Sequence, residues 1–121
     1  MTVLIDTGVL LDYLGGKAAA SESLEKYPNS AISVLTWVEL MALAPASKIE
    51  STRDFLRRFE RLAFNEAIAD RAAQFARAHP GMSLSFSIAY ATARINSMIL
   101  LTVDLPKGLH GETSIEVPYA R

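Results

Sequence analysis

Short apolar runs alternate with helical segments along the chain, and this alternation restricts the fold more than any other feature of the sequence. The runs at 2–5, 31–35 and 98–103 are short, uncharged and rich in Val, Ile and Thr, which is typical of strands buried on both faces. Weaker runs occur at 62–64 and 115–117. Strands that alternate with helices predict an α/β three-layer sandwich with a mainly parallel central sheet of four or five strands.

Glycine and proline residues delimit the segments between these runs, as at Gly15–Gly16 and Pro80–Gly81. The segment 47–62 is amphipathic, with Phe55 and Phe59 on its apolar side, which favours packing onto the sheet. The same side could instead serve a homodimer contact or a groove for a partner protein. Helices are predicted at 9–14, 18–27, 36–43, 47–62, 66–79 and 83–95.

Length and composition indicate one globular domain. The chain has 121 residues and no linker-like segment, so a single domain over 1–121 is expected. It has no cysteine, which excludes disulfides and thiolate metal sites and leaves oxygen or imidazole as metal ligands. With 12 Lys and Arg residues against 13 Asp and Glu residues, any contact with nucleic acid must come from a local patch. No apolar stretch reaches the roughly 18 residues of a membrane helix, and a cytoplasmic location is expected.

Two acidic residues directly follow the strongest strand runs. Asp6 follows VLI, and Asp104 follows ILLTV. The carboxyl ends of parallel strands converge on a crevice, so the two carboxylates are expected to lie near each other. A buried acid is costly without a cation or a donor, and several acids at one edge suggest Mg²⁺ or Mn²⁺. The alternative is that each acid only caps the helix or turn that follows it.

Glu39 is the third candidate ligand. It lies in SVLTWVEL, shortly after the second strand run, and should point at the same crevice as Asp6. Its spacing from Thr36 also fits a capping box, in which the glutamate reaches back to the start of its own helix. Both interpretations are open on the sequence alone.

Four segments together resemble the PIN domain family, especially the VapC-type toxins of bacterial toxin–antitoxin pairs. They are DTGVLLDYL at 6–14, SVLTWVEL at 33–40, IAYATA at 88–93 and LLTVD at 100–104, in the family's order and spacing over nearly the whole chain. The resemblance implies a metal-dependent ribonuclease that hydrolyses RNA phosphodiester bonds. It implies Asp6, Glu39 and Asp104 as catalytic and Mg²⁺- or Mn²⁺-binding residues, a substrate-side hydroxyl at Thr102, and a cognate antitoxin as partner.

One position departs from the family pattern. The family places an aspartate six residues before the threonine of its IAATA-like helix, and counting back from Thr92 leads to Phe86, with Ser85 and Ser87 on either side. A hydroxyl lacks the charge that supplies most of the affinity for Mg²⁺. We therefore expect weaker metal binding and reduced activity. The alternative is a degenerate PIN domain that acts as a non-catalytic RNA- or protein-binding module.

Basic residues suggest where RNA binds. Arg94 and Lys107 are predicted to contact the substrate backbone beside Asp104. Asp12 is predicted to be solvent-facing or to pair with a nearby base, and the less favoured alternative is that it supports a metal ligand from behind. The arginines of the segment 47–62 alternate with acids, which is typical of a solvated or partner-binding face.

Overall fold

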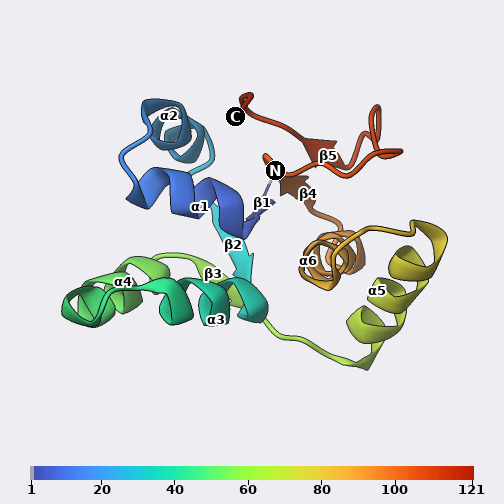
Figure 1. Cartoon of the computed structure of the whole chain (residues 1–121), viewed down its shortest axis with the longest axis horizontal. Coiled ribbons are helices and arrows are strands. Elements are labelled where there is room, and N and C mark those ends of the chain that lie inside the picture. Colours follow the sequence, from blue (N-terminus) through green and yellow to red (C-terminus); the bar gives the residue numbers. More distant parts are fainter. Residues whose placement is uncertain (1) are drawn as a thin grey trace.

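The computed structural model describes residues 2–121, and its centre is a sheet of five strands that are all parallel (Figure 1). The spatial order is β3-β2-β1-β4-β5. Consecutive strands therefore run outward from β1 to β3, and the chain then returns to the other side of β1 with β4. The strands are β1 (Val3–Ile5), β2 (Ser30–Ser33), β3 (Glu60–Leu62), β4 (Ile99–Leu101) and β5 (Ile115–Glu116).

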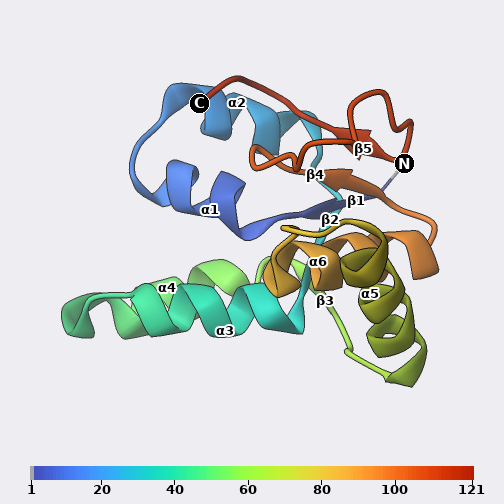
Figure 2. The same cartoon turned by 45° about the vertical axis from the view of Figure 1, so that its right-hand side comes forward.

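Helices cover both faces of the sheet, which confirms the predicted three-layer sandwich. Helices α1 to α4 lie on one side of the sheet, whereas α5 and α6 lie on the other (Figures 1 and 2). None of the helices in residues 2–121 has the length and apolar character to cross a membrane. The helices are α1 (Thr7–Leu14), α2 (Ala18–Lys26), α3 (Val34–Leu43), η1 (Ala46–Lys48), α4 (Ile49–Leu56), α5 (Glu66–Ala78) and α6 (Leu84–Ile95).

The central strand β1 divides the core between the two helical layers. Val3 and Ile5 pack with residues of α1, α3 and α4, whereas Leu4 packs with residues of α6. This alternation follows from the two-residue period of a strand, and all three side chains are apolar because helices cover both faces. Because β1 is packed on both faces, Asp6, which follows Ile5, has a fixed position at the end of the strand.

Several predicted boundaries are wrong, among them that of the weak strand expected at 62–64, which is β3 at Glu60–Leu62. Two of the differences have a clear structural cause. The second strand was expected to continue to residue 35, but it ends at Ser33, whose side chain caps α3 by accepting a hydrogen bond of 3.1 Å from Thr36 N. The helix predicted at 47–62 ends at Leu56, because residues 60–62 form β3 beside β2. An apolar pattern with helical spacing was overridden there by the pairing that the edge of the sheet offers. The remaining α4 packs inward through Phe55, whose ring stacks on Tyr13.

The topology defines where a site should lie. The order in which the chain adds strands to the sheet reverses at β1: β2 and β3 lie on one side of it, and β4 and β5 lie on the other. Strands β1 and β4 are parallel and pair from Val3↔Ile99 to Ile5↔Leu101. In an open parallel sheet the crevice outside the carboxyl ends at such a reversal is the usual place for a ligand. Asp6 directly follows β1 at this place.

Candidate functional site

A cleft of about 450 Å³ opens at the carboxyl edge of the sheet. Its walls come from α1, the middle of α3, the α5–α6 connection with the first turn of α6, and the segment after β4. The side chain of Arg121 completes the lining. The three predicted acids, Asp6, Glu39 and Asp104, all line this cleft. The convergence follows from parallel strands that end at one edge.

Asp6 is the most buried of the three acids, with 6% of its surface exposed. It caps α1, since Oδ1 accepts a hydrogen bond of 2.9 Å from Thr7 N, while Oδ2 accepts one of 2.8 Å from the Thr102 hydroxyl. Burial raises the pKa of the Asp6 carboxyl, the two hydrogen bonds lower it, and the nearby charges of Asp104 and Glu39 raise it further. Asp6 therefore caps α1, and it also lies near two other acids.

Glu39 does not form the capping box that its spacing allowed, because Ser33 is the cap of α3. Its carboxylate instead bridges other segments: Oε1 accepts a hydrogen bond of 2.7 Å from the Thr7 hydroxyl, and Oε2 accepts one of 3.0 Å from the Ser85 hydroxyl. The Thr7 hydroxyl also lies 2.9 Å from that of Thr36. Glu39 is thus held toward the cleft by the residue after Asp6 and by the first turn of α6.

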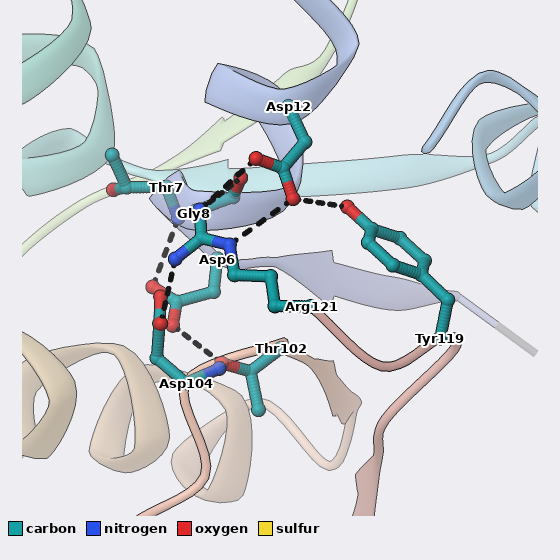
Figure 3. A network of polar contacts seen from close by, with 8 residues as sticks. All are labelled: Asp6, Thr7, Gly8, Asp12, Thr102, Asp104, Tyr119 and Arg121. Carbon is teal, nitrogen blue, oxygen red and sulfur yellow. Dashed lines mark hydrogen bonds and ion pairs between the residues drawn. The ribbon is translucent and has the colours of Figure 1, made fainter. Parts of the chain in front are cut away.

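Asp104 is the exposed acid of the group, with 51% of its side chain accessible. Its backbone N–H donates to the Thr102 hydroxyl at 3.1 Å, and its Oδ1 accepts a hydrogen bond of 2.8 Å from Nη1 of Arg121 (Figure 3). Gly8 allows this arrangement, because a Cβ at that position would lie 2.4 Å from Asp104 Oδ2.

Arg121 is a cleft residue that the sequence did not identify. It reaches back from the segment after β5 to Asp12 on α1, where Nε donates to Oδ2 at 3.2 Å and Nη2 donates to Oδ1 at 3.1 Å (Figure 3). The Tyr119 hydroxyl donates to the same Oδ2 at 2.8 Å. The bond from Arg121 is the main cause that lowers the pKa of Asp12. Asp12 therefore pairs with a base, as one of its predicted settings required, but no sequence spacing linked it to residue 121.

Phe86 is buried, with 5% of its surface exposed, and it packs in the core that α6 shares with Leu4 and Tyr90. It also lines the cleft. Its neighbour Ser85 supplies the hydroxyl that contacts Glu39, whereas the Ser87 hydroxyl bonds the carbonyl of Leu84 within the helix. At this wall of the cleft an aromatic ring and a hydroxyl stand beside the acids.

The three residues predicted to contact substrate lie in different places. Thr102 is fully buried and bonds Asp6, so it orients that carboxylate. Lys107 is exposed and directly follows Pro106. Pro106 lines the cleft, whereas Lys107 is not among the lining residues. Arg94 was expected beside Asp104, and that placement is wrong. It lies near Ile99 and Ser114 at the amino ends of β4 and β5, because α6 ends there before the chain enters β4.

The donor atoms at the cleft fit a hard divalent cation by type. Carboxylate and hydroxyl oxygens are the ligands that Mg²⁺ and Mn²⁺ prefer. A cation would also relieve the burial and like-charge effects that raise the pKa of Asp6. However, across residues 2–121 no three Asp, Glu or His side chains come together closely enough to form a ready-made ion site. The chemistry fits the cation, while the expected cluster is not assembled in this conformation.

Comparison with known proteins gives consistent matches. The PIN domain family model matches residues 3–105. A chain in a toxin–antitoxin complex from Klebsiella pneumoniae is 30% identical, with a TM-score of 0.89 over 98% of this chain and 99% of that chain. FitAcB from Neisseria gonorrhoeae is 23% identical, with a TM-score of 0.77 and 98% coverage of both chains.

DNA-bound VapBC from Salmonella typhimurium is 19% identical, with a TM-score of 0.77 over 96% of this chain and 97% of that chain. No curated protein matches the chain. The family match spans the segments that carry all three cleft acids. The chain belongs to the PIN domain family.

Proposed function

We propose that the protein is a metal-dependent ribonuclease of the VapC toxin type, which hydrolyses RNA phosphodiester bonds at the cleft. The observation that carries this proposal is the setting of Asp6, a buried carboxylate that shares one cleft with Glu39 and Asp104. Among the described residues, the ion pairs at this edge of the sheet go to Asp104 and Asp12, and none goes to Asp6. A buried carboxylate without a cationic partner is costly unless a cation binds it.

In this proposal Asp6, Glu39 and Asp104 hold Mg²⁺ or Mn²⁺, which supplies an activated water and stabilises charge on the phosphate. Thr102 keeps Asp6 in place through its hydroxyl, and Thr7 and Ser85 do the same for Glu39. The carboxylates thereby keep their orientation before a ligand arrives, which is the contribution expected of hydrogen-bond partners behind metal ligands.

The partners of the protein follow from the same proposal. The relative from Klebsiella pneumoniae is described as part of a toxin–antitoxin complex, which supports a cognate antitoxin for this chain. An RNA substrate, a homodimer and a cytoplasmic location remain proposals of the same kind. Neighbouring genes would test the antitoxin partner, because a toxin gene should lie beside a small gene for a DNA-binding antitoxin.

The direct test is cleavage of single-stranded RNA in Mn²⁺ by the wild type, Asp6→Asn and Glu39→Gln. Loss of a metal ligand should lower the rate by about 10²-fold or more. Asp54→Asn is the matched control, because Asp54 lies in an exposed ion pair with Arg57 on α4. Undiminished cleavage by Asp6→Asn, in protein shown free of other nucleases, would exclude this site.

A second candidate is a non-catalytic RNA- or protein-binding module. It is favoured by Phe86, because this chain has an apolar ring packed in the core where the family resemblance implies an aspartate. This candidate expects Mn²⁺ to leave RNA intact while RNA or a protein partner still binds at the cleft. Cleavage that is lost in Asp6→Asn and retained in Asp54→Asn would exclude it.

A further inference from the structure

We infer that Arg121 binds a phosphate of the RNA backbone at the mouth of the cleft, and that Asp12 is the residue that positions it. The inference rests on the proposed function for its substrate class. It is carried by the way in which the guanidinium is fixed on one side and open on the other.

The fixed side of Arg121 consists of three hydrogen bonds. Nε and Nη2 donate to the two carboxylate oxygens of Asp12, and Nη2 also donates to the carbonyl oxygen of Gly8 at 3.2 Å. Tyr119 holds Asp12 from a further direction through its hydroxyl (Figure 3). A fork anchored in this way loses little rotamer freedom when it takes another ligand.

The open side of Arg121 is Nη1, which bears two N–H groups and contacts one oxygen, Oδ1 of Asp104. The Arg121 side chain is 42% exposed and the Asp104 side chain 51% exposed. Ion pairs with this exposure contribute little free energy, so an incoming oxygen can share or replace the contact. A phosphate oxygen is a strong acceptor for such a donor.

The negative charge of the cleft also supports phosphate binding by Arg121. Asp6, Glu39 and Asp104 make its walls acidic, and an RNA phosphate is repelled by each of them. Arg121 is the cationic side chain among the described residues that line the cleft. A phosphate that approaches the acids therefore meets its compensating charge at Nη1.

Blocking is the opposite role that the same contact could have, because Arg121 occupies an oxygen of a proposed metal ligand. The magnitude argues against it, since an exposed ion pair would lower the affinity for the cation by only about fivefold or less. Removal of a blocking guanidinium should tighten Mn²⁺ binding and speed cleavage. Removal of a phosphate ligand should weaken RNA binding.

The first experiment measures the affinity for a short single-stranded oligoribonucleotide in EDTA, across a range of salt concentrations. Arg121→Gln should bind several-fold more weakly, and its salt slope should fall by about 0.7, the value for one phosphate contact on a single strand. Arg57→Gln is the matched control, because it makes the same change in charge at a 63% exposed side chain outside the cleft. It should keep the wild-type slope.

Asp12→Asn tests the positioning role with an expected change of definite sign. The substitution makes the net charge more positive by one, so long-range attraction alone would tighten RNA binding. If Asp12 acts by holding Arg121 in place, binding should weaken despite that gain. Arg121→Lys keeps the charge but cannot make the fork to Asp12, and it should lie between the wild type and Arg121→Gln.

Several outcomes would overturn the inference: Arg121→Gln that binds RNA as tightly as the wild type, Arg121→Gln that cleaves faster in Mn²⁺, or an equal loss in Arg57→Gln. Its failure and that of the proposed function are distinguishable. RNA binding that depends on Arg121 in a protein that never cleaves supports the inference and removes the ribonuclease. Cleavage that depends on Asp6, with KM and salt slope unchanged in Arg121→Gln, supports the ribonuclease and removes the inference.

Discussion

Ser85 donates a hydrogen bond of 3.0 Å to Oε2 of Glu39, and this bond joins α6 on one face of the sheet to α3 on the other. It is one of the two hydrogen bonds that hold the Glu39 carboxylate, the other coming from Thr7. Two helical layers that the sheet separates in the core thus meet at the cleft through a single carboxylate.

Ser85→Ala should lower the affinity for Mn²⁺ by about tenfold, because Glu39 loses a partner that fixes its orientation. The free energy of unfolding should fall by about 1 kcal/mol. Calorimetric titration with Mn²⁺ and urea denaturation measure the two effects. Ser87→Ala is the control, since its hydroxyl bonds the carbonyl of Leu84. Equal losses of Mn²⁺ affinity in both variants would remove the role of the Ser85 bond.

Asp6→Asn should raise the melting temperature in metal-free buffer at neutral pH. Burial raises the pKa of Asp6 in the folded protein above 3.8, the value of a free aspartate. The wild type therefore loses stability as the pH rises from the pKa of the unfolded chain through the higher pKa of the folded protein. Asparagine avoids that loss. The advantage of the variant should thus be absent below pH 3.8, grow above it and then become constant.

Thermal melts from acidic to neutral pH measure this difference, with Asp54→Asn as the exposed control. In Mn²⁺ the order should invert, because the ion stabilises only the protein that binds it. An advantage of Asp6→Asn that persists unchanged in acid would contradict the assignment to its charge.

Gly8→Ala should impair the cleft while the fold is retained. A Cβ at Gly8 would lie 2.4 Å from Asp104 Oδ2, 3.2 Å from Cγ2 of Val103 and 3.3 Å from Nη2 of Arg121. The charged ends of Asp104 and Arg121 can move aside. Alanine itself favours a helix over glycine by about 1 kcal/mol. We expect unchanged or higher thermal stability and at least about tenfold slower RNA cleavage.

Gly15→Ala, at the other end of α1, is the matched control for this prediction. A Cβ there would lie 3.3 Å from the carbonyl oxygen of Leu11 and 3.6 Å from that of Asp12, and it would touch no side chain of the cleft. Its cleavage rate should equal that of the wild type. A loss of the same size in both variants would point to the helix as a whole.

Phe86→Asp should make the stability of the protein depend on metal. Removing the ring from the α6 core costs about 3–5 kcal/mol, and the new carboxyl is buried near Asp6 and Glu39. Mn²⁺ should recover part of this loss and increase cleavage, because a further acid then faces the cleft.

Urea denaturation with EDTA and with Mn²⁺ measures the recovery. Phe86→Ala creates a similar cavity without an acid, so it should gain no more from Mn²⁺ than the wild type does. If the two variants respond equally to Mn²⁺, residue 86 does not face the ion. Wild-type cleavage as fast as that of Phe86→Asp would show that the missing acid is not limiting.

Sequence patterns predicted the sheet and the placement of the acids because both depend on local order along the chain. A strand run buried on both faces ends where its apolar residues end, so Asp6 and Asp104 had to emerge at the carboxyl edge. Glu39 follows for a similar reason, because it lies in α3, the helix that begins directly after β2. Their roles as metal ligands stay predictions.

The unpredicted features depend on long-range contacts. Arg121 meets Asp12 through a return of the chain across the sheet, and no periodicity encodes that return. Arg94 was misplaced because its nearness to Asp104 in sequence does not survive the reversal of direction between α6 and β4. The length of α4 was overestimated because an edge strand took residues with helical spacing.

The hydroxyl of Thr102 accepts a hydrogen bond from the Asp104 amide N–H and donates one to Asp6 Oδ2, while the amide N–H of Thr7 donates to Asp6 Oδ1. Each carboxylate oxygen of Asp6 thus already accepts one hydrogen bond from the protein. Whatever binds this carboxylate, be it a proton or an ion, has to arrive from solvent through the mouth of the cleft. Among the described residues, the most buried carboxylate thus meets its ligands at the cleft.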